Sequence, residues 1–431
     1  MPPIRDQKKK ILFVLENFGA GGVQRVFVNL ARYLSTHGFD VEVAPLRNTG
    51  ALKEELAGIR VIPVWWYRRL LRDHLAWLTI HDESNASWEG GKRIRRVFKH
   101  ACALSRLIKE VRPDIVFSGD MHGNCALSEA KKLIEADSPK IILSLRSHAV
   151  NIRGPSDAKA ILAQGYLGLS EKNLELLSGP WNRELVMRCF SVADAFVVAS
   201  RGLGMEVCEL AGRCDDVHVI PNPVVNERLR ALADEPTRHP WLVRKEAPVV
   251  VSVGRFGPQK DFLTLLEAFS EVRKRRRARL ILVGYDPKSR SHLRYKGELV
   301  ARAKALGISG DIRLEPVTAN PYSLMAGSDV YVLSSPAEGF GNVLVEALYC
   351  RLPIVSTDCP SGPREILKGG EYGRLVPVKD PMAMAEAIIS VLDSLKTEYT
   401  EAARDRLRAR AEEFSEEKIM DKYERLIERL V

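Results

Sequence analysis

Three features are missing from this chain of 431 residues, and each absence excludes a class of protein. No run of about 20 consecutive apolar residues occurs, so we expect no segment that crosses a bilayer. The seven cysteines include no C-x-x-C pair. We therefore expect reduced thiols in a cytosolic compartment, with neither a disulfide nor a zinc site. No two aspartates stand two positions apart, so an aspartate pair that could hold a metal ion is also missing.

The charge balance is basic but evenly spread. Lys and Arg outnumber Asp and Glu by 34 to 28 in residues 1–240 and by 31 to 27 after that, for a net charge of +10. Neither half is a basic tail and no nucleic-acid module is recognisable, so no nucleic-acid partner is expected. The pI near 9.2 keeps such a binder open as a rival hypothesis. A composition of 45% hydrophobic residues excludes disorder, and the length predicts two domains of roughly 200 residues each.

Short apolar runs alternate with longer helical stretches in both halves, which is typical of α/β domains with a doubly wound parallel sheet. The first half has predicted strands at 11–15, 41–46, 60–64, 115–118, 141–145, 196–200 and 217–222, with helices at 23–36, 94–110, 124–136 and 181–192. The second half has predicted strands at 248–254, 279–284, 312–317, 330–335, 353–357 and 374–378, with helices at 261–275, 291–306, 321–327, 342–350, 362–368 and 381–396.

The domain boundaries follow from this alternation. We predict a first Rossmann-like domain over 1–225, a proline-rich and charged linker over 226–247, and a second Rossmann-like domain over 248–414. The remaining helical stretch, about 415–431, is expected to pack back on the first domain. Ligands of such sheets bind at the carboxyl ends of the strands, so candidate site residues are expected in the loops that follow the strands.

The stretch EGFGNVLVE holds two carboxylates, Glu338 and Glu346, around a glycine-containing turn. Gly341 beside Phe340 lets the backbone approach a ligand, and Asn342 is expected to be the N-cap of the following helix. Helix N-terminal amides favour phosphate, so the pattern predicts an anion site with an acid on each side. A capped surface helix with a solvated glutamate is the alternative.

Two further loops could contribute to a diphosphate site. NFGAGGVQR places Gly21 and Gly22 in a turn between strand and helix, a layout that cradles phosphate but serves equally often for packing. VGRFGPQKD places Arg255 and Lys260 on one loop, where a guanidinium and an ammonium can engage two phosphates of one ligand. Solvated surface cations are the alternative for this second loop.

With these residues in view, the chain resembles glycosyltransferase family 4, retaining enzymes of the GT-B fold. The likeness runs through GAGGVQRV, SVADAFVVAS, IPNPV, GRFGPQKD, EGFGNVLVEAL and TDCPSGPREIL, and the glutamate pair matches the E-x7-E motif of that family. Two positions depart from the family pattern. Asp261 stands where glycine is common, and Gln24 stands where glutamate is frequent.

The resemblance implies a role for each matching residue. Arg255 and Lys260 would bind the diphosphate of the sugar donor, and Glu346 the ribose hydroxyls. Glu338, with the backbone of Phe340 and Gly341, would hold the transferred sugar, while Gly21 and Gly22 would approach the phosphates. His148 resembles the family histidine near the donor sugar, although a structural histidine is the alternative. Asn342 belongs to the same donor-binding set.

The implied reaction moves a hexose or N-acetylhexosamine from a nucleotide-diphosphate sugar, UDP-linked, to a glycan or lipid-linked acceptor in polysaccharide or glycoconjugate biosynthesis. Without an aspartate pair, we expect no metal cofactor, and Arg255 and Lys260 would stabilise the leaving diphosphate. A sugar-nucleotide epimerase and a transferase to a small soluble acceptor are the alternatives. Release of the sugar without its transfer would distinguish them.

The acceptor side is predicted from an aromatic and basic segment. Trp65 and Trp66 stand beside Arg68 and Arg69, a combination that suits a membrane interface with anionic lipid. His122, after the strand at 115–118, is expected to line the acceptor side. We therefore expect a cytoplasmic protein attached peripherally to the inner face of a membrane, with a polyprenyl-linked acceptor. A packed core cluster and a solvated helix face are the alternative.

Overall fold

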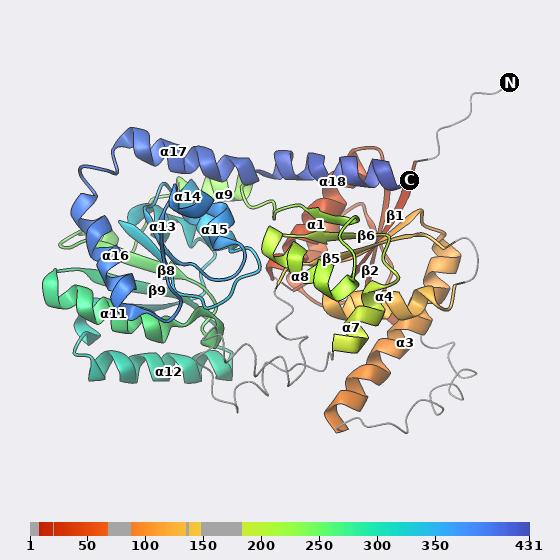
Figure 1. The fold of residues 1–431 in the computed structure, drawn as a ribbon, viewed down its shortest axis with the longest axis horizontal. Coiled ribbons are helices and arrows are strands. Elements are labelled where there is room, and N and C mark those ends of the chain that lie inside the picture. The colour runs from red at the N-terminus through yellow and green to blue at the C-terminus, as the bar shows by residue number, and fades with distance from the viewer. Residues whose placement is uncertain (1–7, 20, 68–87, 135–137, 148–182) are drawn as a thin grey trace. The chain divides into compact units, whose positions relative to one another are not determined.

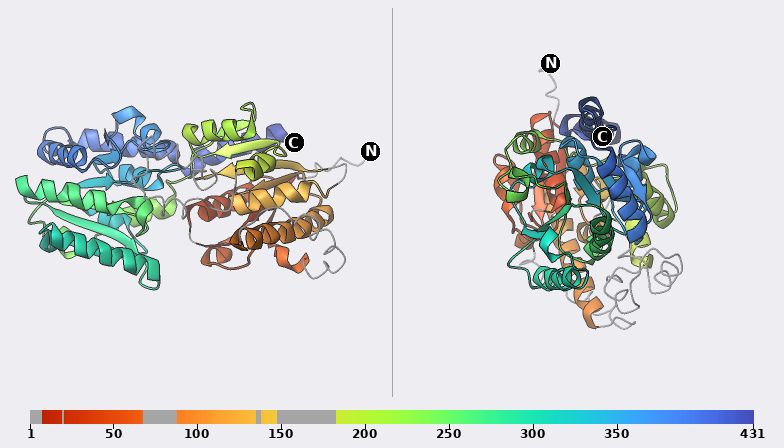
Figure 2. Two further views of the ribbon diagram at one scale, coloured as in Figure 1. Left: turned by 60° about the horizontal axis from the view of Figure 1, so that its bottom comes forward. Right: turned by 90° about the vertical axis from the view of Figure 1, so that its left-hand side faces the viewer.

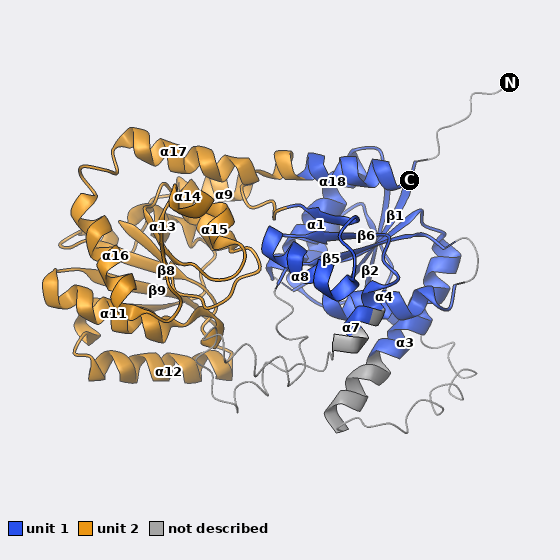
Figure 3. Cartoon of the chain, viewed as in Figure 1, with its two compact units in different colours: residues 1–164, 169–220, 420–431 blue, residues 165–168, 221–419 orange. Residues whose placement is uncertain are grey.

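The computed structural model describes residues 8–19, 21–67, 88–134, 138–147 and 183–431. The chain divides into two compact units, coloured separately in Figure 3. Unit 1 comprises Met1–Gln164, Leu169–Ile220 and Met420–Val431, and unit 2 comprises Gly165–Gly168 and Pro221–Ile419. Residues 226–247, the predicted linker, lie within unit 2 and contain α9 (Glu227–Ala233) and α10 (Pro240–Val243).

Unit 1 is built on a seven-stranded parallel sheet in the order β3-β2-β1-β4-β5-β6-β7. The five inner strands are short apolar runs whose residues are mostly buried, as parallel sheets covered by helices require, whereas the two edge strands are partly exposed. In chain order the strands are β1 (Lys10–Leu15), β2 (Asp40–Pro45), β3 (Arg60–Val61), β4 (Ile115–Ser118), β5 (Lys140–Leu145), β6 (Ala195–Val198) and β7 (Val217–Val219). The predicted strand at 60–64 is longer than the observed β3, which ends at Val61. A 3-10 turn follows at residues 64–67.

Helices cover both faces of this sheet (Figures 1 and 2). In unit 1 the structure describes α1 (Gly22–Thr36), the 3-10 helix η1 (Ala51–Leu56), α3 (Trp88–Val111), α4 (Met121–Lys131), α7 (Arg183–Phe190) and α8 (Arg201–Ala211). Two of them begin with a capping side chain directly after a strand: Asp120 caps α4, and Ser200 caps α8. Among the described residues, none of the helices combines the length and the apolar character that crossing a bilayer requires.

Unit 2 is built on a six-stranded parallel sheet in the order β10-β9-β8-β11-β12-β13. The strands are β8 (Val249–Val253), β9 (Arg279–Tyr285), β10 (Ile312–Pro316), β11 (Val330–Leu333), β12 (Ile354–Thr357) and β13 (Arg374–Val376). The strand order changes direction at β8, where β9 lies on one side and β11 on the other. Such a switch point is where open α/β sheets bind ligands, and the loops after β8 and β11 carry the predicted donor residues.

Two groups of helices cover the sheet of unit 2 (Figure 1). One group shares a single buried core with the strands and consists of α11 (Phe262–Arg275), α12 (Arg290–Ala305) and α16 (Pro381–Ser394). The other group contains α13 (Tyr322–Gly327), α14 (Asn342–Tyr349), α15 (Pro363–Ile366) and α17 (Glu401–Ala411). Short 3-10 helices complete the unit: η4 (Pro258–Lys260), η5 (Ser309–Asp311), η6 (Lys368–Gly370) and η7 (Glu412–Phe414).

The final helix, α18 (Glu416–Leu430), begins in unit 2 and continues in unit 1 from Met420 (Figure 3). Within unit 1 its side chains join the core: Tyr423 and Ile427 are fully buried, and the Tyr423 ring lies 6.1 Å from that of Phe117 on β4. The chain leaves the helical conformation at Ser415, between the end of η7 at Phe414 and the start of α18.

One prediction from cysteine spacing is wrong. The structure joins Cys208 and Cys214 in a disulfide, although no disulfide was expected. Cys208 lies in the last turn of α8, and Gly212 then adopts the left-handed conformation, with φ of 69°, which turns the chain back beside that helix. The five other cysteines are free.

Candidate active site

The donor loop, residues 338–342, follows β11 and leads into α14. Gly341 is the N-cap and has φ of 98°, a conformation that favours glycine. Asn342 is the first helical residue and makes no capping hydrogen bond, so the prediction that it is the N-cap is wrong. Its Oδ1 instead accepts a hydrogen bond of 2.7 Å from Nδ2 of Asn222. The amides at the start of α14 are thus presented by a glycine turn.

A second glycine fixes the backbone of this loop. Gly362 has φ of 76°, and a Cβ atom there would lie 1.9 Å from the carbonyl oxygen of Phe340. Only glycine allows the 358–364 segment to approach so closely. The Phe340 side chain is 3% exposed and packs with the ring of Phe414, whose centroid lies 5.5 Å away. The backbone of Phe340 and Gly341, predicted to contact the sugar, is therefore held from two sides.

Lys260 and Glu338 form an ion pair, with 2.5 Å between Nζ and Oε1. Their side chains are only 19% and 14% exposed. The stem of Lys260 lies against Gly254, where a Cβ atom would be 3.0 Å from three of its carbons. Its carbonyl accepts a hydrogen bond of 2.7 Å from Ser334 at the end of β11. The sequence placed these charges on opposite parts of a ligand, whereas the structure pairs them directly.

The conformation of Asp261 explains its departure from the family pattern. Its φ of 45° is left-handed, so it adopts the backbone shape for which glycine is common. The carboxylate caps α11 by accepting hydrogen bonds from the amide and the hydroxyl of Thr264. Burial raises the pKa of Asp261. The residue supports the turn that carries Lys260, and its side chain supplies the helix cap that glycine would lack.

Glu346 lies in the second turn of α14, behind the donor loop. Burial raises its pKa to about 7, while the nearby charge of Lys260 acts in the opposite direction. Its carboxylate forms no hydrogen bond or ion pair with the residues that the structure describes. A half-buried carboxylate with this pKa can accept or donate a hydrogen bond near neutral pH. It is suited to bind ligand hydroxyls.

Arg255 is the exposed member of the predicted site. It follows β8 directly after Gly254, and within the described parts of the chain it forms no hydrogen bond or ion pair. A guanidinium without an acidic partner is available to an anion. The loops after β8 and β11 thus bring together Arg255, Lys260, Glu338 and the start of α14 in unit 2.

The glycine turn of unit 1 lies between β1 and α1. Gly21 is the N-cap of α1 and Gly22 its first residue. A Cβ atom at Gly21 would lie 2.4 Å from Oε1 of Gln24, the end of a flexible side chain that can move aside, and the φ of −73° is open to any residue, so packing does not require glycine there. Nη1 of Arg25, which lies four positions after Gly21, donates to both carboxylate oxygens of Glu55 at 2.7 and 2.8 Å. The phosphate-binding role of Gly21 and Gly22 stays a prediction.

His122 lies at the start of α4, half-buried, with its Nε2 atom 3.0 Å from Nδ1 of His100. His100 on α3 is 1% exposed. Next to this pair, the Asp120 carboxylate accepts hydrogen bonds from the amides of Glu16 and Gly123, and burial raises its pKa to about 6. This polar cluster lies at the carboxyl end of β4, where the sequence predicted an acceptor residue.

Some predicted site residues lie outside the described parts of the chain. They are His148, Arg68 and Arg69. The two preceding tryptophans are described: Trp65 and Trp66 are 42% and 53% exposed and pack edge to face, with ring centroids 6.1 Å apart. Their exposure contradicts the alternative of a packed core cluster for this pair.

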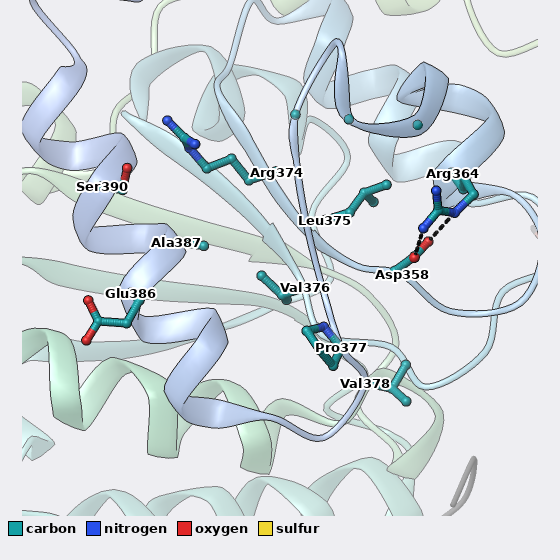
Figure 4. Close-up of a pocket in the computed structure, with 13 residues that line it drawn as sticks. Asp358, Arg364, Arg374, Leu375, Val376, Pro377, Val378, Glu386, Ala387 and Ser390 are labelled. Carbon is teal, nitrogen blue, oxygen red and sulfur yellow. Dashed lines mark hydrogen bonds and ion pairs between the residues drawn. The ribbon is translucent and has the colours of Figure 1, made fainter. Parts of the chain in front are cut away.

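One hollow of unit 2 is lined by other residues. It encloses about 900 Å³ beside β13 and α16, and Glu386, Ser390 and Arg374 line it (Figure 4). Arg364 reaches its rim and is held by both oxygens of Asp358. None of the predicted donor residues lines this hollow. Within the described residues, no cluster of His, Cys, Asp or Glu could hold a metal ion.

Comparison with known proteins assigns a family to both units. Residues 20–228 match the model described as Glycosyltransferase Family 4, and residues 234–413 match the model described as Glycosyl transferases group 1. The lipopolysaccharide core biosynthesis glycosyltransferase LpsE of Rhizobium meliloti is 32% identical over 244 residues, which are 55% of this chain and 65% of that protein.

A second relative, from Campylobacter jejuni, is N-acetylgalactosamine-N,N'-diacetylbacillosaminyl-diphospho-undecaprenol 4-alpha-N-acetylgalactosaminyltransferase. It is 32% identical over 162 residues, covering 37% of this chain and 42% of the relative. The chain thus spans less than two thirds of both relatives.

Solved structures share the fold over nearly the whole chain. Anabaena HepE in complex with UDP and glucose has a TM-score of 0.70 at 19% identity, covering 98% of this chain and all of that one. A glycosyltransferase from Rickettsia africae has a TM-score of 0.70 at 18% identity, covering 98% and 99%. The chain belongs to the group 1 and family 4 glycosyltransferases and has the GT-B fold.

Proposed function

We propose that this protein is a retaining glycosyltransferase that transfers a hexose or N-acetylhexosamine from a UDP-linked donor to a lipid-linked glycan acceptor. The observation that carries the proposal is the set of groups at the switch point of unit 2. Two cations, two carboxylates and a helix N-terminus converge there. Each matches one part of a nucleotide-diphosphate sugar. UDP as the nucleotide is supported by Anabaena HepE, whose structures contain UDP and UDP-glucose.

The roles follow from charge and burial. Arg255 and Lys260 bind the diphosphate, together with the amides at the start of α14. Glu346 binds the ribose hydroxyls, and Glu338 binds the sugar. In the structure Lys260 is paired with Glu338. Because a diphosphate competes for Lys260, donor binding weakens this ion pair and makes Glu338 available to sugar hydroxyls.

The reaction proceeds on one face of the sugar. The bond between the anomeric carbon and the diphosphate oxygen breaks, and the acceptor hydroxyl oxygen forms the new bond from the same side. Its proton passes to the leaving diphosphate. Arg255 and Lys260 stabilise the charge that develops on the diphosphate without help from a metal ion. A role for His148 in the reaction rests on the family resemblance alone.

The test is a transfer assay with purified protein, a panel of nucleotide sugars and lipid-linked acceptors. We expect turnover to persist in a chelator and to fall at least about a hundredfold in Lys260→Ala and Arg255→Ala, because each removes a cation from the diphosphate. Lys274→Ala is the matched control, since Lys274 is exposed and pairs with Glu271 in its own helix. A strict Mg²⁺ requirement would disprove the metal-free mechanism.

An epimerase would use the same donor site and is the second candidate. The assay separates the two by its products. Transfer yields a nucleoside diphosphate and a glycosylated acceptor in equal amounts, whereas epimerisation releases the sugar or its isomer without any acceptor. The relatives from R. meliloti and C. jejuni, named for lipopolysaccharide and undecaprenol-linked products, support transfer to a lipid-linked acceptor.

Peripheral membrane attachment is supported by the exposed tryptophan pair. Two indole rings on the surface of unit 1 suit the interface of a bilayer. We expect flotation with vesicles that contain anionic lipid, and loss of flotation when Trp65 and Trp66 are both changed to Ser. Met205→Ser, at a more exposed apolar residue of the same unit, is the control. If the variant with both tryptophans changed floated with the vesicles as well as Met205→Ser does, the tryptophans would be excluded as the membrane anchor.

A further inference from the structure

Two segments of unit 2 run side by side next to the points where the chain passes between the units. These paired segments are residues 222–226 and 414–416. The amides of Val224 and Val225 donate to the carbonyl of Phe414 at 3.0 and 3.2 Å, and the amide of Glu416 donates to the carbonyl of Val225 at 2.8 Å. The backbone of each segment is therefore fixed by the other.

Both paired segments touch the donor loop through side chains. From the first segment, Nδ2 of Asn222 donates to Oδ1 of Asn342 at 2.7 Å. From the second, the Phe414 ring packs edge to face against Phe340, with an interplanar angle of 69°. Asn222 is 6% exposed and Phe340 3% exposed, so these contacts are shielded from water. A shielded hydrogen bond between short side chains restricts position more than a solvated one does.

The Phe414 side of this arrangement is itself anchored. Arg410, which is 7% exposed, lies 4.8 Å from the centre of the Phe414 ring. Its guanidinium donates to the carbonyls of Ile366 at 2.9 Å and Glu365 at 2.8 Å, both at the end of α15. The ring that supports Phe340 is thus connected to α15, which follows Gly362 in the segment against the Phe340 carbonyl.

We infer that Asn222 and Phe414 are positioning residues of the donor site. This inference rests on the proposed function and deepens it. Asn342 is the first residue of α14, and the amides beside it are the groups proposed to meet the diphosphate. Gly341 alone leaves this turn flexible, because glycine adopts many backbone conformations. Asn222 and Phe414 hold the turn in the one conformation that aims those amides at the ligand.

The test measures UDP affinity by calorimetry for the full chain. Asn222→Ala and Asn342→Ala are each expected to weaken UDP binding about tenfold, as the loss of one well-placed hydrogen bond does. Both changes remove the same contact, so their effects should not add. The double variant is therefore expected to have a UDP dissociation constant within about twofold of that of the single variant that binds UDP less tightly. Additive losses would show that Asn222 does not act through Asn342.

Two further variants separate positioning from stability. Asn226→Ala is the matched control, since Asn226 lies in the same segment and caps only α9. It is expected to lower the melting temperature and leave UDP affinity unchanged. Phe414→Leu keeps an apolar side chain but loses the ring contact with Phe340, and it is expected to weaken UDP binding. If Asn226→Ala weakened binding as much as Asn222→Ala, the effect would be one of stability and the inference would be wrong.

The outcomes also distinguish this inference from the proposed function. If Lys260→Ala and Asn342→Ala weaken UDP binding but Asn222→Ala and Phe414→Leu do not, the donor site stands and the positioning role is overturned. If the wild-type protein binds no UDP, ADP or GDP, the donor site itself is overturned, and the positioning role with it.

Discussion

Glu346 gives the stability of unit 2 a dependence on pH. Its pKa is about 7 in the folded protein because burial disfavours the charged form, against about 4.5 for an exposed glutamate. Between these values the unfolded chain releases this proton while the folded protein keeps it, so the free energy of unfolding falls as pH rises. Below pH 4.5 the carboxyl is protonated in both states and has no effect.

Glu346→Gln should therefore gain stability over the wild type as pH increases from about 4.5 to 7, by at most roughly 3 kcal/mol. Urea unfolding at a series of pH values measures this difference. Glu298→Gln, at an exposed position on α12, is the control and should show no such trend. A constant difference between Glu346→Gln and wild type across this range would contradict the burial argument.

Asp261 permits a second test at a single residue. Asp261→Ala should cost roughly 1–2 kcal/mol, because alanine neither caps α11 nor favours the left-handed conformation. Asp261→Asn should be at least as stable as wild type at pH 7, since asparagine caps helices and tolerates that conformation and carries no charge to bury. Thermal unfolding compares the two, and equal stability of both variants would refute the role in capping.

At the scale of elements, Arg410 connects α17 to α15 from a buried position. Arg410→Ala should lower the free energy of unfolding by about 3 kcal/mol, because it leaves one buried and one partly buried carbonyl without their donor. Arg406→Ala on the same helix is the control. Arg406 is exposed, and its contact with Glu371 at 3.4 Å is a surface ion pair. Urea denaturation should show a change within about 0.5 kcal/mol for this control.

Most elements were predictable from local pattern, and the exceptions have physical causes. The apolar runs 11–15 and 279–284 correspond to β1 and β9. Parallel strands that are buried on both faces typically read as short, continuous apolar runs, so these strands could be predicted. The α14 cap was assigned wrongly because Asn342 is a good cap by type, whereas Gly341 occupies that position. Which residue is the N-cap depends on the backbone dihedral angles of the turn, and these cannot be predicted from the residue types alone.

Within the candidate site, residue identities were predictable but their partners were not. The sequence singled out Lys260 and Glu338, yet it gave no sign that they pair with each other across 78 positions. Asn222 stood in the IPNPV stretch that carried the family resemblance, but its role was missed, since its partner Asn342 lies 120 positions away. Such contacts depend on the tertiary fold. The Cys208–Cys214 pair was missed because it depends on a turn at Gly212.

At the scale of the whole molecule, the basic charge does not favour nucleic acid. The densest cationic run, residues 273–277, is neutralised in the structure, since each of its five members contacts an acidic side chain. Such ion pairs reduce the charge that a phosphate backbone would meet. We therefore expect no saturable binding of a single-stranded RNA at micromolar protein in 150 mM salt, measured by fluorescence anisotropy. Micromolar affinity that falls steeply with added salt would contradict this.

The path of α18 has a consequence for synthesis of the chain. Domains usually fold in the order in which the ribosome makes them. Unit 1 is an exception, because Tyr423 and Ile427 belong to its core and are made after every residue of unit 2. Until these residues leave the ribosome, the apolar surface that they cover stays open. The first unit to be translated is thus completed last, and a nascent chain stalled before α18 would present that surface to chaperones.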